Sequence, residues 1–396
     1  MQKVYILGSC RTPIGKMGGT LSSLSAVDLG AIVIKEALTR STVQPEQVDH
    51  VFMGCVLQAG QGQNPARQAA IKAGLPVTTT AQTMNIVCGS GLDAVNSAAR
   101  MIQVGDADIV IAGGMESMSN APFAVMNARF GYKMGSPMVN TPLVDTMVND
   151  GLWEAMNNYH MGITAENVAE KWGITREELD IFSAASQKKA SAAIAEGRFK
   201  KENVPVVIKG RKGDTVIDSD EGPRPGTTAE ALAKLKPAFR KDGIVTAGNS
   251  SGINDGAAAV ILVSEAKVKE LGLSPEAEWL GGVLCGVDPA IMGIGPVEST
   301  RKLLKKLNLT MEDIDIVEAN EAFAAQSIAV KRELNIPEDK LNINGGAIAL
   351  GHPIGASGCR ILVTLIHAMG ERNAKTGLAT LCIGGGMGCS TVIRKI

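Results

Sequence analysis

The two ends of the chain resemble each other, and this internal repeat restricts the possible folds more than any other feature of the sequence. An amphipathic helix pattern at about 28–40 leads into the segment 48–51, and a second one at about 297–308 leads into 314–317. The two segments match at one constant offset in two apolar residues and the aspartate between them. Self-similarity of this kind predicts two similar structural units that pack together.

Each half then repeats one order of features: a Gly-containing turn, a helix pattern, an apolar strand closed by glycines, and a final strand. In the first half the turn and the two strands cover 88–91, 109–112 and 257–263. In the second half they cover 355–358, 379–383 and 390–393. Alternating strands and helices predict an α/β fold with mostly parallel sheets, and apolar strands without clean alternation are expected where helices cover both faces.

A long middle segment has no counterpart in the second half, so it is expected to be an insertion. We predict one half from 1–120 plus 246–272, an inserted loop domain at 121–245, and a second half at 273–396. Within 198–242 there are eleven Lys and Arg against seven Asp and Glu. Long insertions often carry substrate contacts, although the charge alone fits a solvated surface lobe equally well.

Composition and charge exclude several broad classes of protein. Hydrophobic residues make up 45% and charged residues 20% of the chain, and the formal net charge is −1. We therefore expect a globular protein with no nucleic-acid partner and no membrane association, because no apolar run is long enough to span a bilayer. The seven cysteines are scattered without a CxxC pair, and no leader-like pattern is evident. The expected location is a reducing cytoplasm, with no metal site.

Cys88 is the first candidate for chemistry. A strand-like stretch ends at Val87, and Gly89, Ser90 and Gly91 then open a helix pattern. The unpaired N–H groups and the dipole at a helix N-terminus favour a thiolate, which is the reactive form of cysteine. A lone cysteine is as often a small buried hydrophobe, so the two interpretations are evenly balanced for this residue alone.

Three further segments, all in the second half, could also carry chemistry. His352 lies between Gly351 and Pro353 in a rigid turn suited to a general base, although a structural loop histidine is the slightly commoner case. Cys382 ends an apolar strand before consecutive glycines whose N–H groups could form an oxyanion pocket, and core packing is its alternative. Asn320 could bind a water or a carbonyl oxygen, but alone it fits a helix N-cap better.

Taken together, four segments resemble the active-site motifs of the thiolase family. They are Cys88-Gly-Ser, Asn320-Glu-Ala-Phe, Gly351-His-Pro and Cys382-Ile-Gly, in this order along the chain. Each motif alone is weak, but all four in order, at corresponding places of an internal duplication, are highly specific. The resemblance covers the whole chain. It implies duplicated α/β halves with mixed, mostly parallel sheets in α-β-α-β-α layers, and an inserted loop domain.

The resemblance also implies a role for each matching residue. Cys88 would be the nucleophile that takes the acyl group from acyl-CoA, and His352 the base that activates it and helps to bind the thioester oxygen. Cys382 would exchange a proton with C2 of the second acetyl-CoA. Asn320 would hold a water in a first oxyanion hole, and the N–H groups of Cys88 and Gly384 would form a second. A covalent thioester on the enzyme predicts ping-pong kinetics.

By the same resemblance, the inserted domain and its neighbours would bind coenzyme A. The predicted contacts are His160, Met161, Arg224, Phe239, Ala247, Ser251, Met292, Ala322 and Phe323. Met161 and Met292 resemble the bulky side chains that close the acyl pocket of short-chain members. Methionine is also a frequent gap-filler in protein cores, which is the alternative interpretation.

The resemblance therefore predicts a short-chain thiolase of the bacterial biosynthetic type, which converts two acetyl-CoA reversibly to acetoacetyl-CoA and CoA. Coenzyme A would be substrate and product, without a separate cofactor, and family members suggest a homotetramer. The alternatives are a degradative 3-ketoacyl-CoA thiolase of broader chain length, a condensing enzyme acting on acyl carrier protein, and a thiolase-like protein that binds lipid without turnover. Asn320 argues against the second alternative, and the retained Cys88, His352 and Cys382 argue against the third.

Overall fold

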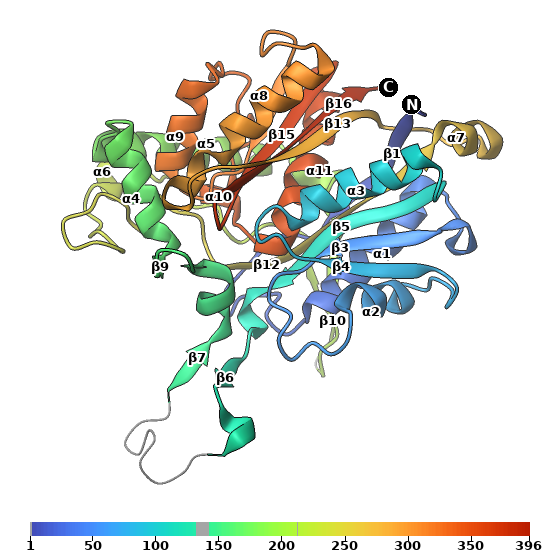
Figure 1. Ribbon diagram of the computed structural model, residues 1–396, viewed down its shortest axis with the longest axis horizontal. Coiled ribbons are helices and arrows are strands. Elements are labelled where there is room, and N and C mark those ends of the chain that lie inside the picture. Colours follow the sequence, from blue (N-terminus) through green and yellow to red (C-terminus); the bar gives the residue numbers. More distant parts are fainter. Residues whose placement is uncertain (1, 132–141, 212) are drawn as a thin grey trace.

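The computed structural model describes residues 2–131, 142–211 and 213–396, and its centre is one mixed sheet covered by helices (Figure 1). Within these residues the sheet has ten strands, and the short β2 (Gly15–Lys16) pairs with one end of β12. The other strands form a row in the order β14 (Ile316–Ala319), β15 (Thr376–Ile383), β16 (Met387–Lys395), β13 (Ala277–Gly286), β1 (Val4–Arg11), β12 (Asn254–Ser264), β5 (Ile109–Ser117), β3 (His50–Gly54) and β4 (Thr80–Met84).

The row consists of two similar halves that meet where β1 pairs with β13. In the first half β3 and β5 are parallel and β12 is antiparallel to its neighbours; in the second half β14 and β15 are parallel and β16 is antiparallel to its neighbours. The predicted mixed α/β fold is confirmed. The sheet has more antiparallel pairs of strands than the alternation of strands and helices suggests. The reason is that β12 and β16 each run antiparallel to both of their neighbours.

Two matched aspartates show the duplication at the level of single contacts. Asp49 precedes β3, and its side chain accepts a hydrogen bond from the N–H of Ile109 at 3.0 Å. Asp315 precedes β14, and its side chain accepts one from the N–H of Thr376 at 2.9 Å. In both halves the aspartate therefore links the start of one strand, through a hydrogen bond, to the start of the strand that runs parallel to it. The internal repeat predicted from the sequence is confirmed.

Helices cover the outer faces of both half-sheets and fill the space between them (Figure 1). Those of the first half are α1 (Ala26–Ser41), α2 (Pro65–Lys72) and α3 (Ser90–Val104), and those of the second are α8 (Gly295–Leu307), α9 (Ala324–Glu333) and α11 (Ile354–Arg372). Helices α1 and α2 lie on one outer face and α8 and α9 on the other, while α3 and α11 pack against each other in the middle. The implied α-β-α-β-α layering is confirmed.

The predicted insertion contains small elements around two longer helices. They are β6 (Phe123–Val125), β7 (Leu143–Asp145), a π-helical segment (Val148–Leu152), β8 (Trp153–Glu154), β9 (Tyr159–His160), α4 (Met161–Lys171), α5 (Arg176–Ala195), β10 (Val206–Ile208), β11 (Thr215–Ile217) and α6 (Ala229–Leu232). Helix α4 packs against α9 of the second half. The division at 121–245 stays a prediction, and positions 132–141 and 212 of it lie outside the described residues.

The remaining elements are short. They are α7 (Glu265–Leu271), α10 (Ala347–Leu350) and 3-10 turns at Pro45–Gln47, Met118–Asn120, Ala128–Phe130, Arg198–Lys200 and Pro289–Ile294. No helix in the described part of the chain is both long enough and apolar enough to cross a bilayer.

Candidate active site

One cavity of about 410 Å³ collects most of the residues predicted for the site. It lies where the first turns of α3 and α11 meet the elements of the insertion. Twelve of the fourteen predicted residues line it: Cys88, His160, Met161, Arg224, Phe239, Ala247, Ser251, Met292, Ala322, Phe323, His352 and Gly384. The other two, Asn320 and Cys382, are buried and do not line the cavity. The Asn320 amide nitrogen is 3.4 Å from a ring nitrogen of His352.

Cys88 lies in a strained turn that is held by the first residue of α3. The preceding Val87 has φ of 52°, a conformation that costs a β-branched residue about 1–3 kcal/mol and is typical of functional sites. The Ser90 hydroxyl donates to the carbonyl of Val87 at 2.6 Å and accepts from the N–H of Ile86 at 3.0 Å. These two bonds fix the turn, so the thiol is presented at the helix start with little freedom.

His352 faces Cys88, and Ser357 determines which ring nitrogen carries the proton. Nε2 of His352 lies 3.3 Å from Sγ of Cys88, and Nδ1 lies 2.5 Å from the Ser357 hydroxyl. That hydroxyl donates its only proton to the carbonyl of Pro353 at 2.9 Å. Ser357 must therefore accept from Nδ1–H, which leaves the lone pair of Nε2 directed at the thiol. The arrangement is that of a general base next to a nucleophile.

Burial keeps both members of this pair neutral at pH 7. It raises the pKa of Cys88 to about 11, although the N–H groups of Gly384 and Cys88 lower it. Burial, assisted by the positive charge of Arg360, lowers the pKa of His352 to about 3. The expectation that the helix start would favour a resting thiolate is therefore wrong, because desolvation outweighs the two N–H groups. The sulfur becomes nucleophilic only when His352 takes its proton.

Asn320 and Cys382 are the two buried residues of the site that do not line the cavity. Asn320 lies beside His352, and Cys382 lies near Cys88. Asn320 follows β14, and its backbone carbonyl accepts a hydrogen bond from the side-chain amide of Gln326 at 3.1 Å. Within the described residues the Oδ1 atom of Asn320 is buried without a hydrogen-bond partner, which is unusual for a buried amide. Cys382 lies in β15, and burial together with the nearby Cys88 raises the pKa of its thiol far above the ordinary value. Gly384 follows it, at the cavity wall.

Two family models match the chain. The family model for the N-terminal domain of thiolases matches residues 4–266, and the model for their C-terminal domain matches residues 273–395.

The chain belongs to the thiolase family.

Relatives and solved structures extend over the whole of this thiolase. It is 58% identical to the acetyl-CoA acetyltransferase of Pseudomonas aeruginosa, over 100% of both chains. It is 60% identical to the acetyl-CoA acetyltransferase of Chromobacterium violaceum, over 99% of this chain and 100% of the relative. The crystal structure of the Bacillus anthracis acetyl-CoA acetyltransferase superposes with a TM-score of 0.97 at 45% identity, covering 100% of this chain and 99% of that one. The expected acyltransferase class is thereby confirmed.

In this thiolase the insertion contributes an aromatic wall to the cavity. The His160 ring caps α4 by accepting from the N–H of Gly162 at 3.0 Å, and it stacks on Phe239 with centroids 4.7 Å apart. Phe239 in turn meets Phe323 edge-on at 6.1 Å. Gly162 is needed here, since a Cβ at that position would lie 2.1 Å from the Phe239 ring. The insertion and the second half are thus joined at the cavity.

Two methionines and an arginine also line the cavity. Met161 and Met292 are both buried, and a Cβ at Gly384 would lie 3.2 Å from the Met161 methyl. Met161 therefore restricts the space beside Gly384. Arg224 lines the cavity too, and its backbone N–H donates to Gln187 of α5 at 2.8 Å. Its guanidinium thus comes from a loop that α5 holds in place.

Several residues of the site lie outside the set predicted from the sequence. Ser357, within the predicted turn 355–358, is one of them, although a hydroxyl one turn after a candidate base is a recognisable signal. Met118, Leu152 and Ile354 also line the cavity. They come from a 3-10 turn, the π-helical segment and the start of α11, and no local pattern indicates that these three would converge.

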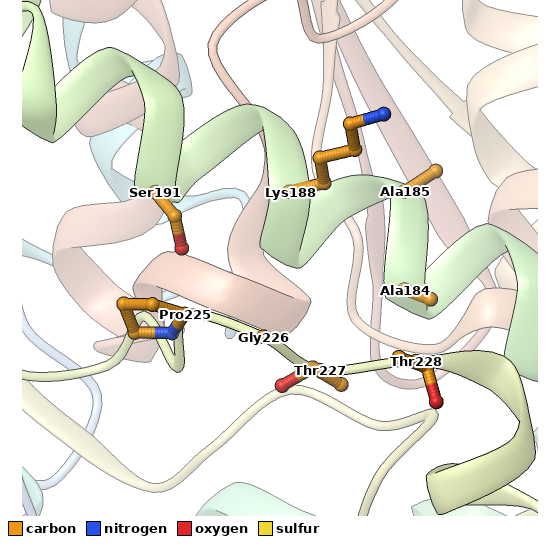
Figure 2. A pocket seen from close by; sticks show the side chains of 8 residues that line it. All are labelled: Ala184, Ala185, Lys188, Ser191, Pro225, Gly226, Thr227 and Thr228. Atoms are coloured by element: carbon orange, nitrogen blue, oxygen red, sulfur yellow. The ribbon is translucent and has the colours of Figure 1, made fainter.

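A second cavity, of about 370 Å³, lies between α5 and the loop 225–228 of the thiolase (Figure 2). None of the predicted site residues lines it. In Figure 2 the Ser191 hydroxyl points toward the loop at Pro225, while the Lys188 side chain extends away from that loop. No set of reactive groups converges there. Among the described residues, no group of three or more His, Cys, Asp or Glu is arranged to hold a metal ion, and the seven cysteines are free thiols.

Proposed function

We propose that this thiolase is an acetyl-CoA acetyltransferase that interconverts two acetyl-CoA with acetoacetyl-CoA and CoA. The observation that carries the proposal is the 3.3 Å contact between Nε2 of His352 and Sγ of Cys88, at the wall of a cavity lined by two methionines. The relatives bearing that name, at 58% and 60% identity over essentially the whole chain, support it.

The first half-reaction moves an acetyl group onto the enzyme. His352 takes the thiol proton through Nε2 as Sγ of Cys88 attacks the thioester carbonyl of acetyl-CoA. The tetrahedral oxyanion collapses, the C–S bond to CoA breaks, and the leaving CoA thiolate takes the proton of Cys382, which becomes a thiolate, while His352 keeps the proton of Cys88. The products are acetyl-Cys88 and free CoA. Proton transfer by a positioned base typically supplies about 10²–10⁴ in rate.

The second half-reaction forms the carbon–carbon bond. Cys382, as thiolate, removes a proton from C2 of a second acetyl-CoA, and the enolate oxygen is stabilised by His352 and a water held on Oδ1 of Asn320. The enolate attacks the carbonyl carbon of acetyl-Cys88. The developing oxyanion accepts hydrogen bonds from the N–H groups of Cys88 and Gly384. The Cys88 sulfur then leaves as acetoacetyl-CoA forms and takes back the proton that His352 held, while Cys382 keeps the proton from C2, so both thiols are restored. A strongly basic thiolate suits this step, because the high pKa of buried Cys382 matches the weak acidity of a thioester α-carbon.

Coenzyme A would bind across the insertion side of the cavity. The aromatic wall of His160, Phe239 and Phe323 would flank its pantetheine arm, and Arg224 would lie near its phosphates as a cation. We further propose a cytoplasmic homotetramer, with coenzyme A as substrate and product and no separate cofactor. These proposals rest on the resemblance to the family.

The deciding measurement is CoA-dependent cleavage of acetoacetyl-CoA beside a medium-chain 3-ketoacyl-CoA, with Cys88→Ala as control. Cleavage of acetoacetyl-CoA alone, lost in the control, is the expected result. Comparable or faster cleavage of the longer substrate would reassign the chain as a degradative 3-ketoacyl-CoA thiolase. The human mitochondrial 3-ketoacyl-CoA thiolase superposes with a TM-score of 0.96, so the fold does not separate the two. No cleavage of either substrate would favour a binding protein.

A further inference from the structure

A fully buried carboxylate, Glu116, lies beneath the active site and has no role in the chemistry above. It is near the end of β5, beyond the last residue of β3 that pairs with this strand. Its two oxygens accept hydrogen bonds from the N–H groups of Val56, Leu57 and Gly355 at 3.0, 3.2 and 2.9 Å. A carboxylate with three backbone donors joins whatever segments supply those donors.

The segments that Glu116 joins belong to opposite halves of the molecule. Val56 and Leu57 follow β3 in the first half, whereas Gly355 is the second residue of α11 in the second half. The N-cap of α11, Pro353, provides no side-chain cap, so Glu116 satisfies a free N–H of the helix start and places a negative charge at its positive end. The catalytic candidate His352 directly precedes that N-cap.

The contact is close enough to transmit small displacements. A Cβ at Gly355 would lie 2.7 Å from Oε2 of Glu116 and 3.0 Å from Cα of Cys55. Ile354 and Leu57 both approach Gly151 of the cavity wall, since a Cβ at Gly151 would lie 2.9 Å from the first and 3.3 Å from the second. Moving the start of α11 therefore moves both His352 and the wall beside the acyl group.

We propose that Glu116 is a positioning residue of the active site: its carboxylate ties the segment 55–57 to the start of α11 and so holds His352 against Cys88. The inference rests on the proposed function, since it assigns a task within that reaction. Burial raises the pKa of Glu116 to about 7, although its three backbone donors lower it, and in its charged form Glu116 opposes a thiolate on Cys88.

The test is Glu116→Gln, which keeps the size of the side chain but replaces one acceptor oxygen by a donor facing N–H groups. Misplacing His352 by a fraction of an ångström should lower kcat for acetoacetyl-CoA cleavage about 10- to 100-fold. KM should change by less than about threefold, because the proposed CoA contacts are on the insertion side of the cavity. Gly355→Ala disturbs the same contact between Glu116 and the start of α11, because the added methyl group would clash with the carboxylate. It should give the same loss of kcat.

Asp93→Asn is the matched control. Asp93 is a buried carboxylate in the first turn of α3, but its partner is Arg100 at 3.4 Å rather than an active-site loop. The kcat of the Asp93→Asn variant should stay within about twofold of the wild type. Glu116→Asp keeps the charge and should recover part of the activity lost in Glu116→Gln. An unchanged kcat in a folded Glu116→Gln or Gly355→Ala variant would overturn the proposal.

A second readout separates this inference from the proposed function. Ring-nitrogen NMR of histidine-labelled protein reports the tautomer of His352, whose signal is identified by its loss in His352→Asn. We expect a single Nδ1-protonated signal in the wild type, a shifted or broadened one in Glu116→Gln, and no change in Asp93→Asn. An inactive wild type with this pattern would reject the acetyltransferase and keep the positioning role. An unperturbed signal in Glu116→Gln would reject the positioning role whatever the activity.

Discussion

The two halves of this thiolase share one order of strands and helices but bring different groups to the site. In the first half the residue before the N-cap of the central helix is a nucleophile, Cys88, and in the second half it is a base, His352. The neighbouring strand ends also differ. β5 carries the carboxylate Glu116, which hydrogen-bonds backbone groups, whereas β15 carries Cys382, a thiol beside the cavity. The duplicated scaffold thus sets positions, and the side chains at those positions set the chemistry.

The helix starts also use serine in two different ways. Ser90 in α3 hydrogen-bonds the backbone on both sides of Val87 and so holds a strained turn. Ser357 in α11 hydrogen-bonds the ring of His352 and so holds a proton on Nδ1. One half therefore controls the shape of the backbone, and the other controls a tautomer. Variants that remove one function at a time test whether this division of labour is real.

Removal of the base should have the largest effect. His352→Ala leaves Cys88 as a neutral thiol with a pKa of about 11 and no acceptor for its proton. We expect a loss on the order of 10⁴-fold in the rate of Cys88 acetylation by acetyl-CoA, measured by rapid quench and mass spectrometry. Acetylation at the wild-type rate would show that the second half does not activate the first.

Asn320→Ala should separate the two half-reactions. The proposed water on Oδ1 of Asn320 stabilises the enolate but not the acetylation of Cys88. Loss of one oxyanion contact should therefore slow condensation by about 10²–10³-fold while acetylation stays near the wild-type rate. Single-turnover measurements of both steps check this. An equal loss in both steps would place Asn320 in the first half-reaction as well.

The pH dependence of stability should report the burial of His352. The pKa of His352 in the folded protein, about 3, is below the ordinary value of 6.5. Between these two pH values the imidazole is therefore protonated in the unfolded chain and neutral in the folded protein. This contribution destabilises the fold progressively as pH falls from about 6.5 toward 3 and is absent above that range. Urea unfolding of the wild type and His352→Asn should diverge across this window. Parallel curves would mean that His352 is protonated in the folded protein.

Exchange of the two serines for alanine should give smaller and contrasting effects. Ser357→Ala removes the acceptor for Nδ1–H, so His352 can adopt the tautomer that protonates Nε2, and kcat should fall about tenfold with little change in stability. Ser90→Ala removes two bonds from the strained turn and should cost about 1–2 kcal/mol of unfolding free energy. Urea unfolding and steady-state kinetics on both variants would show the contrast. Similar profiles for the two serines would contradict it.

The repeat and the four motifs predicted the layers of the fold and most of the cavity. They did so because an α/β duplication places the starts of two central helices side by side, which brings Cys88 to His352 without knowledge of any contact. The resemblance to the family also pointed to His160 and Phe239, which line the cavity. These predictions depend on chain order and on residue type, which the sequence contains in full.

The remaining features depend on contacts between distant segments and on solvent exclusion. The neutral state of Cys88 follows from complete burial, and a helix-start pattern cannot reveal this. Glu116 looks like one more residue at the end of an apolar strand, and its three backbone donors come from two other parts of the chain. Met118 and Leu152 reach the cavity from segments with no periodicity. Such residues become evident only when the fold is assembled.

The smallest expected effect tests the symmetry of the scaffold itself. Asp49 and Asp315 are exposed, matched residues that each accept backbone hydrogen bonds from the start of the neighbouring parallel strand. Asp49→Ala and Asp315→Ala should each lower the unfolding free energy by about 0.5–1.5 kcal/mol, with kcat unchanged, because water replaces the lost contacts. Equal shifts in urea midpoint would show that the two half-sheets are energetically equivalent. A clearly larger cost in one half would mean that the duplicated strands are similar in geometry but unequal in stability, with the more costly half limiting the stability of the shared site.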